Sequence, residues 1–267
     1  MPDIMTEHAG SILRIQLNRP TKKNALTSSM YSTIAELLDD AAKDDQTRVV
    51  LWHGAGDSFT AGNDLDDFMK NPPGPSESPQ ARLNQALMNF PKPLVAAVHG
   101  AAIGSGTTML AYCDFVYAGE NARFQLPFVN LGLVPEFGSS CLLPLRLGYI
   151  HAAELILLGQ PFDASQAAAL GLVTWVVPDR EVLTTANEVA QRLAEKPAGA
   201  LQACKHLITR PVRAQLEEAV RAEAEEFAVR VRSADAREAF TAFFEKRRPD
   251  FTKSQRTPTS ARATNGS

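Results

Sequence analysis

The sequence predicts an α/β protein with a mostly parallel sheet and a helical C-terminal region. Stretches rich in β-branched residues alternate with amphipathic stretches in the first half of the 267 residues, and helical patterns dominate from about residue 138. Strands that alternate with helices form parallel sheets with crossover helices. Hydrophobic residues make up 45% and charged residues 21%, as in an ordinary globular protein.

The first half contains the expected strands, at residues 11–17, 48–54, 93–100 and 113–119. A helix is expected at residues 27–44, since Thr27 or Ser28 can cap it. Its apolar residues share one face: Ile34, Leu37, Leu38 and Ala41.

The second half contains one short expected strand, at residues 172–178, among helices. These helices are expected at residues 139–148, 150–159, 164–171, 180–196, 198–208, 213–231 and 235–247. The change in pattern divides the chain into an α/β core (1–195), a helical region (196–251) and a tail (252–267). The tail lacks large apolar residues and is expected to be disordered. A mobile surface loop is expected at residues 71–80, NPPGPSESPQ.

Charge and composition exclude several classes of protein. A net charge of -3 argues against a nucleic-acid-binding surface. The three cysteines form no CxxC pair, which favours a reducing compartment. The N-terminus has no apolar signal region, and the apolar residues 93–113 are broken by His99 and three glycines. We therefore expect a cytoplasmic protein without a membrane partner.

Two stretches present backbone N–H groups. Gly104 and Gly106 form a turn before a helix, where backbone N–H groups can stabilise an oxyanion. Considered without the rest of the sequence, the turn is better explained by close packing of small residues between a strand and a helix. A dinucleotide fingerprint would need a glycine where Met109 stands. In "SFTAGNDLDDF", residues 58–68, the N–H of Asn63 can point outward after a tight turn.

Familiar metal and nucleophile motifs are missing. The aspartates at 64, 66 and 67 do not have EF-hand spacing and favour a helix start over a metal site. The sequence has no Gly-x-Ser-x-Gly, His-Glu-x-x-His or P-loop motif. One carboxylate, Glu136 in "GLVPEFGSS", has mostly apolar neighbours. It is either an exposed turn residue or an acid/base with a shifted pKa.

Six stretches taken together resemble the crotonase superfamily of enoyl-CoA hydratases and isomerases. They are IQLNRPTKKNAL, FTAGNDLDDF, PKPLVAAVHGAAIGSGTTMLAYCD, ARFQLPFVNLGLVPEFGSSCLLPLRLG, ALGLVTWVV and FFEKRRPDF, in order over roughly residues 5–251. The resemblance implies a spiral of ββα units with a helical C-terminal trimerisation region. It also implies acyl-CoA thioester substrates and a homotrimer or dimer of trimers. No metal or redox cofactor is implied, because coenzyme A arrives with the substrate.

The resemblance also assigns roles to residues. It implies an oxyanion hole made by the backbone N–H groups of Asn63 and Ser105, where Ser105 replaces a family glycine and still has an N–H. Contacts with CoA would fall near Lys23, Ala25, Ala61, Asp64 and Leu65, with Phe243 and Lys246 reaching CoA across a subunit boundary.

The carboxylates indicate the reaction. Family hydratases have glutamates at the positions of Thr108 and Phe128, so the pair that activates water is absent here. Glu136 remains, as in isomerases of the peroxisomal type, and Phe128 and Phe137 should raise its pKa. Together with Thr108 these two phenylalanines are expected to form the acyl pocket.

The resemblance therefore implies a Δ3,Δ2-enoyl-CoA isomerase. The alternatives are hydration or another crotonase reaction such as dehalogenation, which usually needs an aspartate. A catalytically weak acyl-CoA-binding protein and, from the glycine turn alone, a nicotinamide oxidoreductase are further alternatives.

Overall fold

A six-stranded, mostly parallel sheet forms the centre of the molecule, as predicted. The computed structural model describes residues 1–71 and 77–252. The strand order is β1-β2-β3-β4-β6-β9, in which β1 and β2 are antiparallel and all other neighbours are parallel. These strands are β1 (Ile4–Ala9), β2 (Ile12–Leu17), β3 (Val49–Gly54), β4 (Leu94–Val98), β6 (Phe115–Gly119) and β9 (Trp175–Val177).

The strands that follow β4 and β6 in the chain belong to a second, smaller sheet. It has the order β5-β7-β8, formed by β5 (Ala101–Ile103), β7 (Arg123–Gln125) and β8 (Phe162–Asp163). The chain passes from β4 to β5 and then into the short helix α4 (Ser105–Thr108). Such a unit contributes one strand to each sheet before a helix, which is the ββα arrangement that the family resemblance implies.

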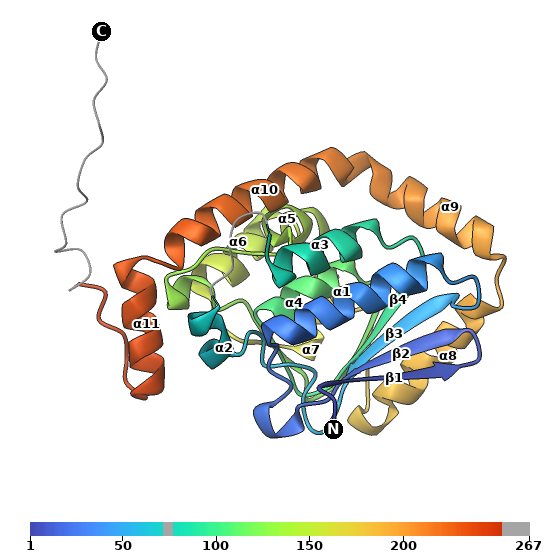
Figure 1. The fold of residues 1–267 in the computed structure, drawn as a ribbon, viewed down its shortest axis with the longest axis horizontal. Helices are drawn as coiled ribbons and strands as arrows, with labels where there is room; N and C mark the ends of the chain where they lie inside the picture. The colour runs from blue at the N-terminus through green and yellow to red at the C-terminus, as the bar shows by residue number, and fades with distance from the viewer. Residues whose placement is uncertain (72–76, 253–267) are drawn as a thin grey trace, which may run out of the picture.

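Helices cover both faces of the large sheet. Helices α1 (Ser28–Lys43) and α3 (Pro79–Asn89) pack against each other in front of it, whereas α8 (Val182–Ala194) lies behind it against β3, β4 and β6 (Figure 1). Of the expected apolar face of α1, Ile34, Leu38 and Ala41 are buried and Leu37 is partly buried; Met30, Tyr31 and Ala35 are buried as well. Burial of these side chains is the main favourable term that holds the layers together.

The C-terminal helices form an arm along one side of the molecule (Figure 1). They comprise α9 (Ala198–Thr209), α10 (Arg213–Arg230) and α11 (Ala234–Phe244). The ring of Phe68 in α2 (Leu65–Lys70) meets Phe227 of α10 and Phe240 of α11 edge to face. The arm is thereby anchored to the α/β part of the same chain.

The remaining helical elements connect these layers. They are α5 (Ser139–Leu147), α6 (Tyr149–Leu158) and α7 (Ala164–Ala169), with 3-10 turns η1 (Pro20–Lys22), η2 (Met109–Tyr112), η3 (Val129–Leu131), η4 (Asp179–Glu181) and η5 (Arg210–Val212). In residues 1–71 and 77–252 no helix combines the length and the apolar character that crossing a membrane requires.

The predicted loop at residues 71–80 is wrong at its C-terminal end. Ser78 caps α3, which begins at Pro79, because a proline in the first turn of a helix loses no hydrogen bond. Residues 72–76 of that prediction, and all of the expected tail except Thr252, lie outside the described residues. The boundary near residue 195 stays a prediction. The sequence patterns missed β1, whose interior residues are all exposed and show no alternation.

Asn24 fixes the loop that leads into the site. Its side chain accepts a hydrogen bond from the Arg19 N–H (2.8 Å) and donates to the carbonyl oxygens of Ala55 (2.8 Å) and Ser58 (2.7 Å). Its φ of 55° is a conformation that asparagine tolerates better than most residues. The chain after Asn24 consequently runs beside residues 61–64, where the Leu26 N–H donates to the Gly62 oxygen at 2.8 Å.

Candidate active site

Two backbone segments that follow neighbouring strands lie side by side and in parallel. Thr60 pairs with Ala102, and the Ile103 N–H donates to the Thr60 oxygen at 3.1 Å. Beyond this pair Asn63 and Ser105 also lie near each other, because the Tyr31 hydroxyl contacts a side-chain oxygen of each. At Gly62, φ is +84° and a Cβ would lie 2.5 Å from the Ile103 oxygen, so a side chain there would prevent the approach.

The backbone N–H groups of Asn63 and Ser105 donate no hydrogen bond to any acceptor in the described part of the chain. Ser105 is the first residue of α4, where N–H groups have no acceptor in the helix. Gly104, with φ 56° and ψ -119°, makes the turn from β5 into α4, and Ser105 is fully buried after it. That these two N–H groups form an oxyanion hole stays a prediction.

A chain of polar side chains joins both segments to Glu136. The fully buried Tyr31 hydroxyl of α1 donates to Oδ1 of Asn63 at 2.7 Å and lies 2.8 Å from Oγ of Ser105. With Oδ1 thus engaged, the Asn63 amide points its Nδ2 at Oε1 of Glu136, 3.4 Å away. The tyrosine therefore orients the amide that contacts the carboxylate. Sequence reasoning missed this hydroxyl, whose only signal is a polar group on the apolar side of α1.

Glu136 lies in a half-buried position before α5. The next residue, Phe137, is buried with φ 59°, and its ring stacks on Tyr31 at 6.0 Å between centroids. The pKa of Glu136 is raised from 4.5 to about 8, mainly by burial and also by the nearby charge of Glu223, whereas the Asn63 hydrogen bond opposes the shift. A carboxyl with a pKa near neutrality can accept and release a proton at physiological pH.

A cavity of about 730 Å³ opens beside Glu136, between α3 and α10. This volume is in the range of small-molecule sites. Its lining includes Glu136, Phe137, Asn84, Val220, Glu223 and Phe227. Of the expected acyl-pocket residues only Phe137 lines this cavity. Thr108 and Phe128 are buried outside it, and the Thr108 hydroxyl donates to the Ser105 oxygen at 3.3 Å.

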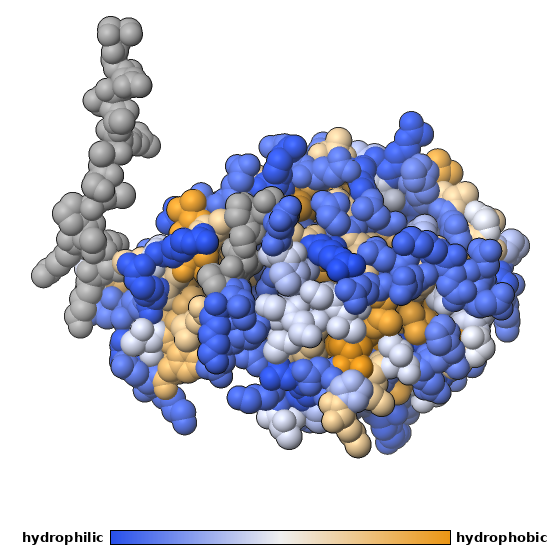
Figure 2. Space-filling view, in the orientation of Figure 1, coloured by the Kyte–Doolittle hydropathy of each residue, from blue (hydrophilic) through white to orange (hydrophobic). Residues whose placement is uncertain are grey.

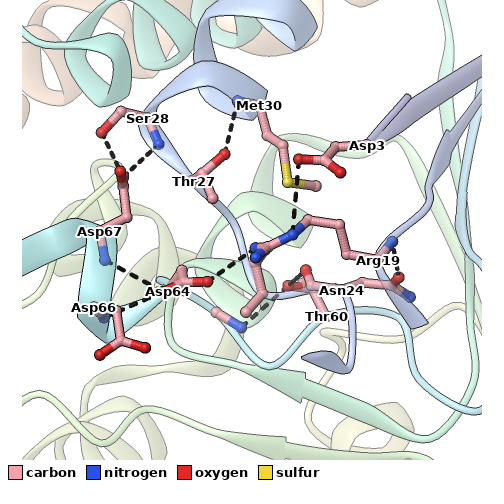
Figure 3. A network of polar contacts seen from close by, with 12 residues as sticks. Asp3, Arg19, Asn24, Thr27, Ser28, Met30, Thr60, Asp64, Asp66 and Asp67 are labelled. Carbon is pink, nitrogen blue, oxygen red and sulfur yellow. Dashed lines mark hydrogen bonds and ion pairs between the residues drawn. The ribbon is translucent and has the colours of Figure 1, made fainter. Parts of the chain in front are cut away.

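The acidic stretch after Asn63 builds a helix start, as predicted. Asp64 accepts from the N–H groups of Asp66 (3.1 Å) and Asp67 (3.3 Å) and pairs with Arg19 at 3.0 Å (Figure 3). Asp67 in turn accepts from the N–H of Ser28 at 2.7 Å (Figure 3). No three histidines, cysteines, aspartates or glutamates of residues 1–71 and 77–252 are grouped to hold a metal ion.

The residues expected to contact CoA fall into two groups. Lys23, Ala25, Ala61, Asp64 and Leu65 lie on the paired segments around Asn63, where the Ala61 N–H donates to the Lys23 oxygen at 2.8 Å. The Asp64 carboxylate is occupied by Arg19 and by α2, its N–H donates to the Leu26 oxygen at 2.8 Å, and its own oxygen accepts from the Phe68 N–H at 2.8 Å. Phe243 and Lys246 are exposed at the end of α11, and apolar surface shows on this side of the molecule (Figure 2). These assignments stay predictions.

Comparison with known proteins gives consistent matches over nearly the whole chain. The family described as "Enoyl-CoA hydratase/isomerase" matches residues 7–255. The 1,2-epoxyphenylacetyl-CoA isomerase of Escherichia coli (strain K12) is 35% identical over 259 residues, which are 94% of this chain and 99% of that protein. Enoyl-CoA delta isomerase 2 of Homo sapiens is 40% identical over 231 residues, which are 82% of this chain but 57% of that protein. Relatives of similar identity are named as hydratases.

Solved structures agree with the sequence matches. OdaA of Pseudomonas aeruginosa superimposes with a TM-score of 0.89 at 45% sequence identity, and the match covers 91% of this chain and 99% of OdaA. The same score is reached by an enoyl-CoA hydratase/isomerase of Pseudoalteromonas atlantica T6c, 39% identical, over 94% of this chain and 100% of that one. The described fold is therefore that of these proteins.

The raised pKa of Glu136 should make the stability of the protein depend on pH. Between pH 4.5 and about 8 the unfolded chain has lost this proton while the folded protein retains it, so the contribution of Glu136 to stability falls as the pH rises. We expect the free energy of unfolding of Glu136→Gln, relative to the wild type, to increase by about 2 kcal/mol or more across this window. Urea unfolding at several pH values measures it.

The exposed Glu120 provides the matched control for this experiment. Glu120→Gln should differ from the wild type by the same small amount at every pH in the window. A difference between Glu136→Gln and the wild type that does not change with pH would show that Glu136 titrates normally.

Proposed function

Because this chain belongs to the enoyl-CoA hydratase/isomerase (crotonase) family, whose enzymes act on acyl-CoA thioesters, we propose that it is a Δ3,Δ2-enoyl-CoA isomerase. The observation that carries the proposal is the position of Glu136, a carboxyl with a raised pKa that lines the cavity and also contacts the side chain of Asn63. Glu223, the buried carboxylate nearby, has both oxygens occupied by backbone N–H groups. This leaves Glu136 to transfer protons.

In the proposed reaction Glu136 removes a proton from C2 of a 3-enoyl thioester. The electron pair of that C–H bond moves into the conjugated system, and the negative charge rests on the thioester oxygen. The N–H groups of Asn63 and Ser105 donate to this oxygen and stabilise the dienolate. Glu136 then returns the proton to C4, the double bond moves to the 2-position, and the carboxylate is restored. The reaction consumes no water and needs no metal or redox cofactor.

Hydration is the second candidate, favoured by the hydratases among the relatives. It would require a positioned water and a second proton-transfer group. The positions of Thr108 and Phe128 supply neither, and both residues are buried. A catalytically weak acyl-CoA-binding protein remains a third candidate.

We also propose that Lys23, Ala25, Ala61, Asp64 and Leu65 contact CoA, with Phe243 and Lys246 reaching it from a second subunit. A cytoplasmic location stays a prediction.

The isomerase proposal predicts that the protein converts a 3-enoyl-CoA to the conjugated 2-enoyl-CoA, which is followed by ultraviolet absorbance. Glu136→Gln should lower kcat by roughly a thousandfold, since general acid–base groups contribute about that much. Glu120→Gln should retain the wild-type rate. Equal rates in Glu136→Gln and the wild type would remove Glu136 from the chemistry. Loss of conjugation from added 2-enoyl-CoA, with water gained in the product mass, would identify a hydratase.

The Tyr31 hydroxyl should support the same reaction without touching the substrate. Tyr31→Phe leaves Oδ1 of Asn63 and Oγ of Ser105 without their shared partner, so we expect kcat to fall about tenfold. Tyr117→Phe is the matched control, because this buried tyrosine packs on the α8 side of the large sheet. Unchanged kcat in Tyr31→Phe would show that Asn63 and Glu136 hold their positions without it.

We further propose a homotrimer or a dimer of trimers. Helix α6 exposes large apolar side chains, among them Tyr149, Ile150, Leu157 and Leu158. Their exposed fractions of 56–77% would be costly in a monomer, and a second copy can cover them. Sedimentation velocity should show a trimer or hexamer that Ile150→Asp disrupts and Leu183→Asp on α8 does not. A monomeric wild type would contradict this assembly.

A further inference from the structure

A second buried carboxylate, Glu223, holds the segment that carries Glu136. It belongs to α10 and is 8% exposed. Its Oε2 accepts from the Gly138 N–H and its Oε1 from the Ser140 N–H, both at 2.7 Å. The contact joins residues 85 positions apart in sequence. The two anchored amides lie two and four residues after Glu136, so the carboxylate fixes the backbone that follows it.

Helix α5 depends on this contact for its N-terminal cap. Its own N-cap residue is Gly138, which has no side chain, and its first turn contains no acidic residue. The N–H groups at a helix start need acceptors, and the partial positive charge there favours an anion. Glu223 supplies both from another helix. A Cβ on Gly138 would lie 2.4 Å from Leu216 and 2.9 Å from the Tyr112 hydroxyl, which shows how closely α10 approaches.

The two carboxyl groups of this pair have unequal surroundings. Glu223 has short hydrogen bonds to both oxygens and faces a helix N-terminus, which favours its ionised form. Glu136 has one long contact, 3.4 Å from an amide nitrogen. When like-charged groups are close, the proton stays on the group with the poorer hydrogen bonding.

We infer that Glu223 is a positioning residue for Glu136. It fixes the backbone of residues 138–140, and it keeps its own negative charge so that Glu136 holds the proton of the pair. The inference rests on the proposed function only in assuming that Glu136 exchanges this proton with a substrate. Burial raises the pKa of both groups, and the charge of Glu223 raises the pKa of Glu136 further.

Other titratable groups face this pair from the surrounding elements. Tyr31 comes from α1, Tyr112 from η2 and Cys141 from α5, and burial raises the pKa of all three. The cavity wall adds charged groups at Glu77, Arg82, Glu217 and Arg221. Arg82 pairs with Glu36 and Arg221 with Glu218. Glu217 pairs with Arg213. Glu223 differs from these groups because its charge acts on Glu136 and its oxygens also accept hydrogen bonds from the segment that carries Glu136.

The test measures the protonation of Glu136 without using its activity. Urea unfolding of the wild type, Glu136→Gln, Glu223→Gln and the double variant gives the pH window in which Glu136 destabilises the fold. In the Glu223→Gln background we expect the upper edge of this window, near pH 8 in the wild type, to move down by about one unit. The exposed Glu225 on the same helix is the matched control, and Glu225→Gln should leave the window in place.

If Glu223→Gln folds and the upper edge of its window stays near pH 8, the electrostatic part of the inference is overturned. If Glu223→Gln does not fold, nuclear magnetic resonance of the wild type answers the same question. The amide signals of Gly138 and Ser140 should then show an ionised Glu223 at neutral pH. A large titration of both amides above neutrality would reverse the assignment. In the plot of kcat/KM against pH, the acidic limb should move together with the upper edge of the window. If the window shifts but the protein has no isomerase activity, the proposed function is refuted and the inference about Glu223 stands.

Discussion

The site depends on the close parallel approach of the segment after β3 to the segment after β4. The backbone bonds between Thr60 and residues 101–103 set the register, and Gly62 allows the contact because a Cβ there would meet the Ile103 oxygen at 2.5 Å. Without this approach Asn63 and Ser105 would not lie close enough to share the Tyr31 hydroxyl. The rest of the site is attached to it, because Tyr31 bonds to both segments and the Asn63 amide contacts Glu136.

Polar groups of the site are arranged so that few are left for solvent. Asn24 satisfies two carbonyl groups after β3, and Asp64 caps α2 while it pairs with Arg19 (Figure 3). Buried polar groups are costly unless they are bonded, so each of these contacts removes an alternative conformation of the loops. The unbonded N–H groups of Asn63 and Ser105 stand out against this background, which supports their proposed role toward a ligand.

Much of the fold could be predicted from the sequence, because its central strands and amphipathic helices carry strong periodic signals. Helix α1 followed its capping residue and apolar face closely. Strand β1 has an exposed interior and gave no signal, and α3 begins with a proline that sequence patterns also associate with loops. Glu136 was singled out by its apolar neighbours in the sequence, and the family resemblance favoured an acid/base role for it. Tyr31 and Glu223 were missed because their roles arise from contacts between distant segments, and Glu223 is one of several acids in α10.

The cap on α5 makes the site sensitive to the completeness of the chain. During synthesis the central strands and the segment with Glu136 leave the ribosome well before α10, since Glu223 follows Gly138 by 85 residues. Domains tend to fold as their residues emerge, N-terminal parts first. The α/β part can then become compact while the start of α5 still lacks its acceptor. The segment that carries Glu136 would thus gain its anchor only after α10 has been made.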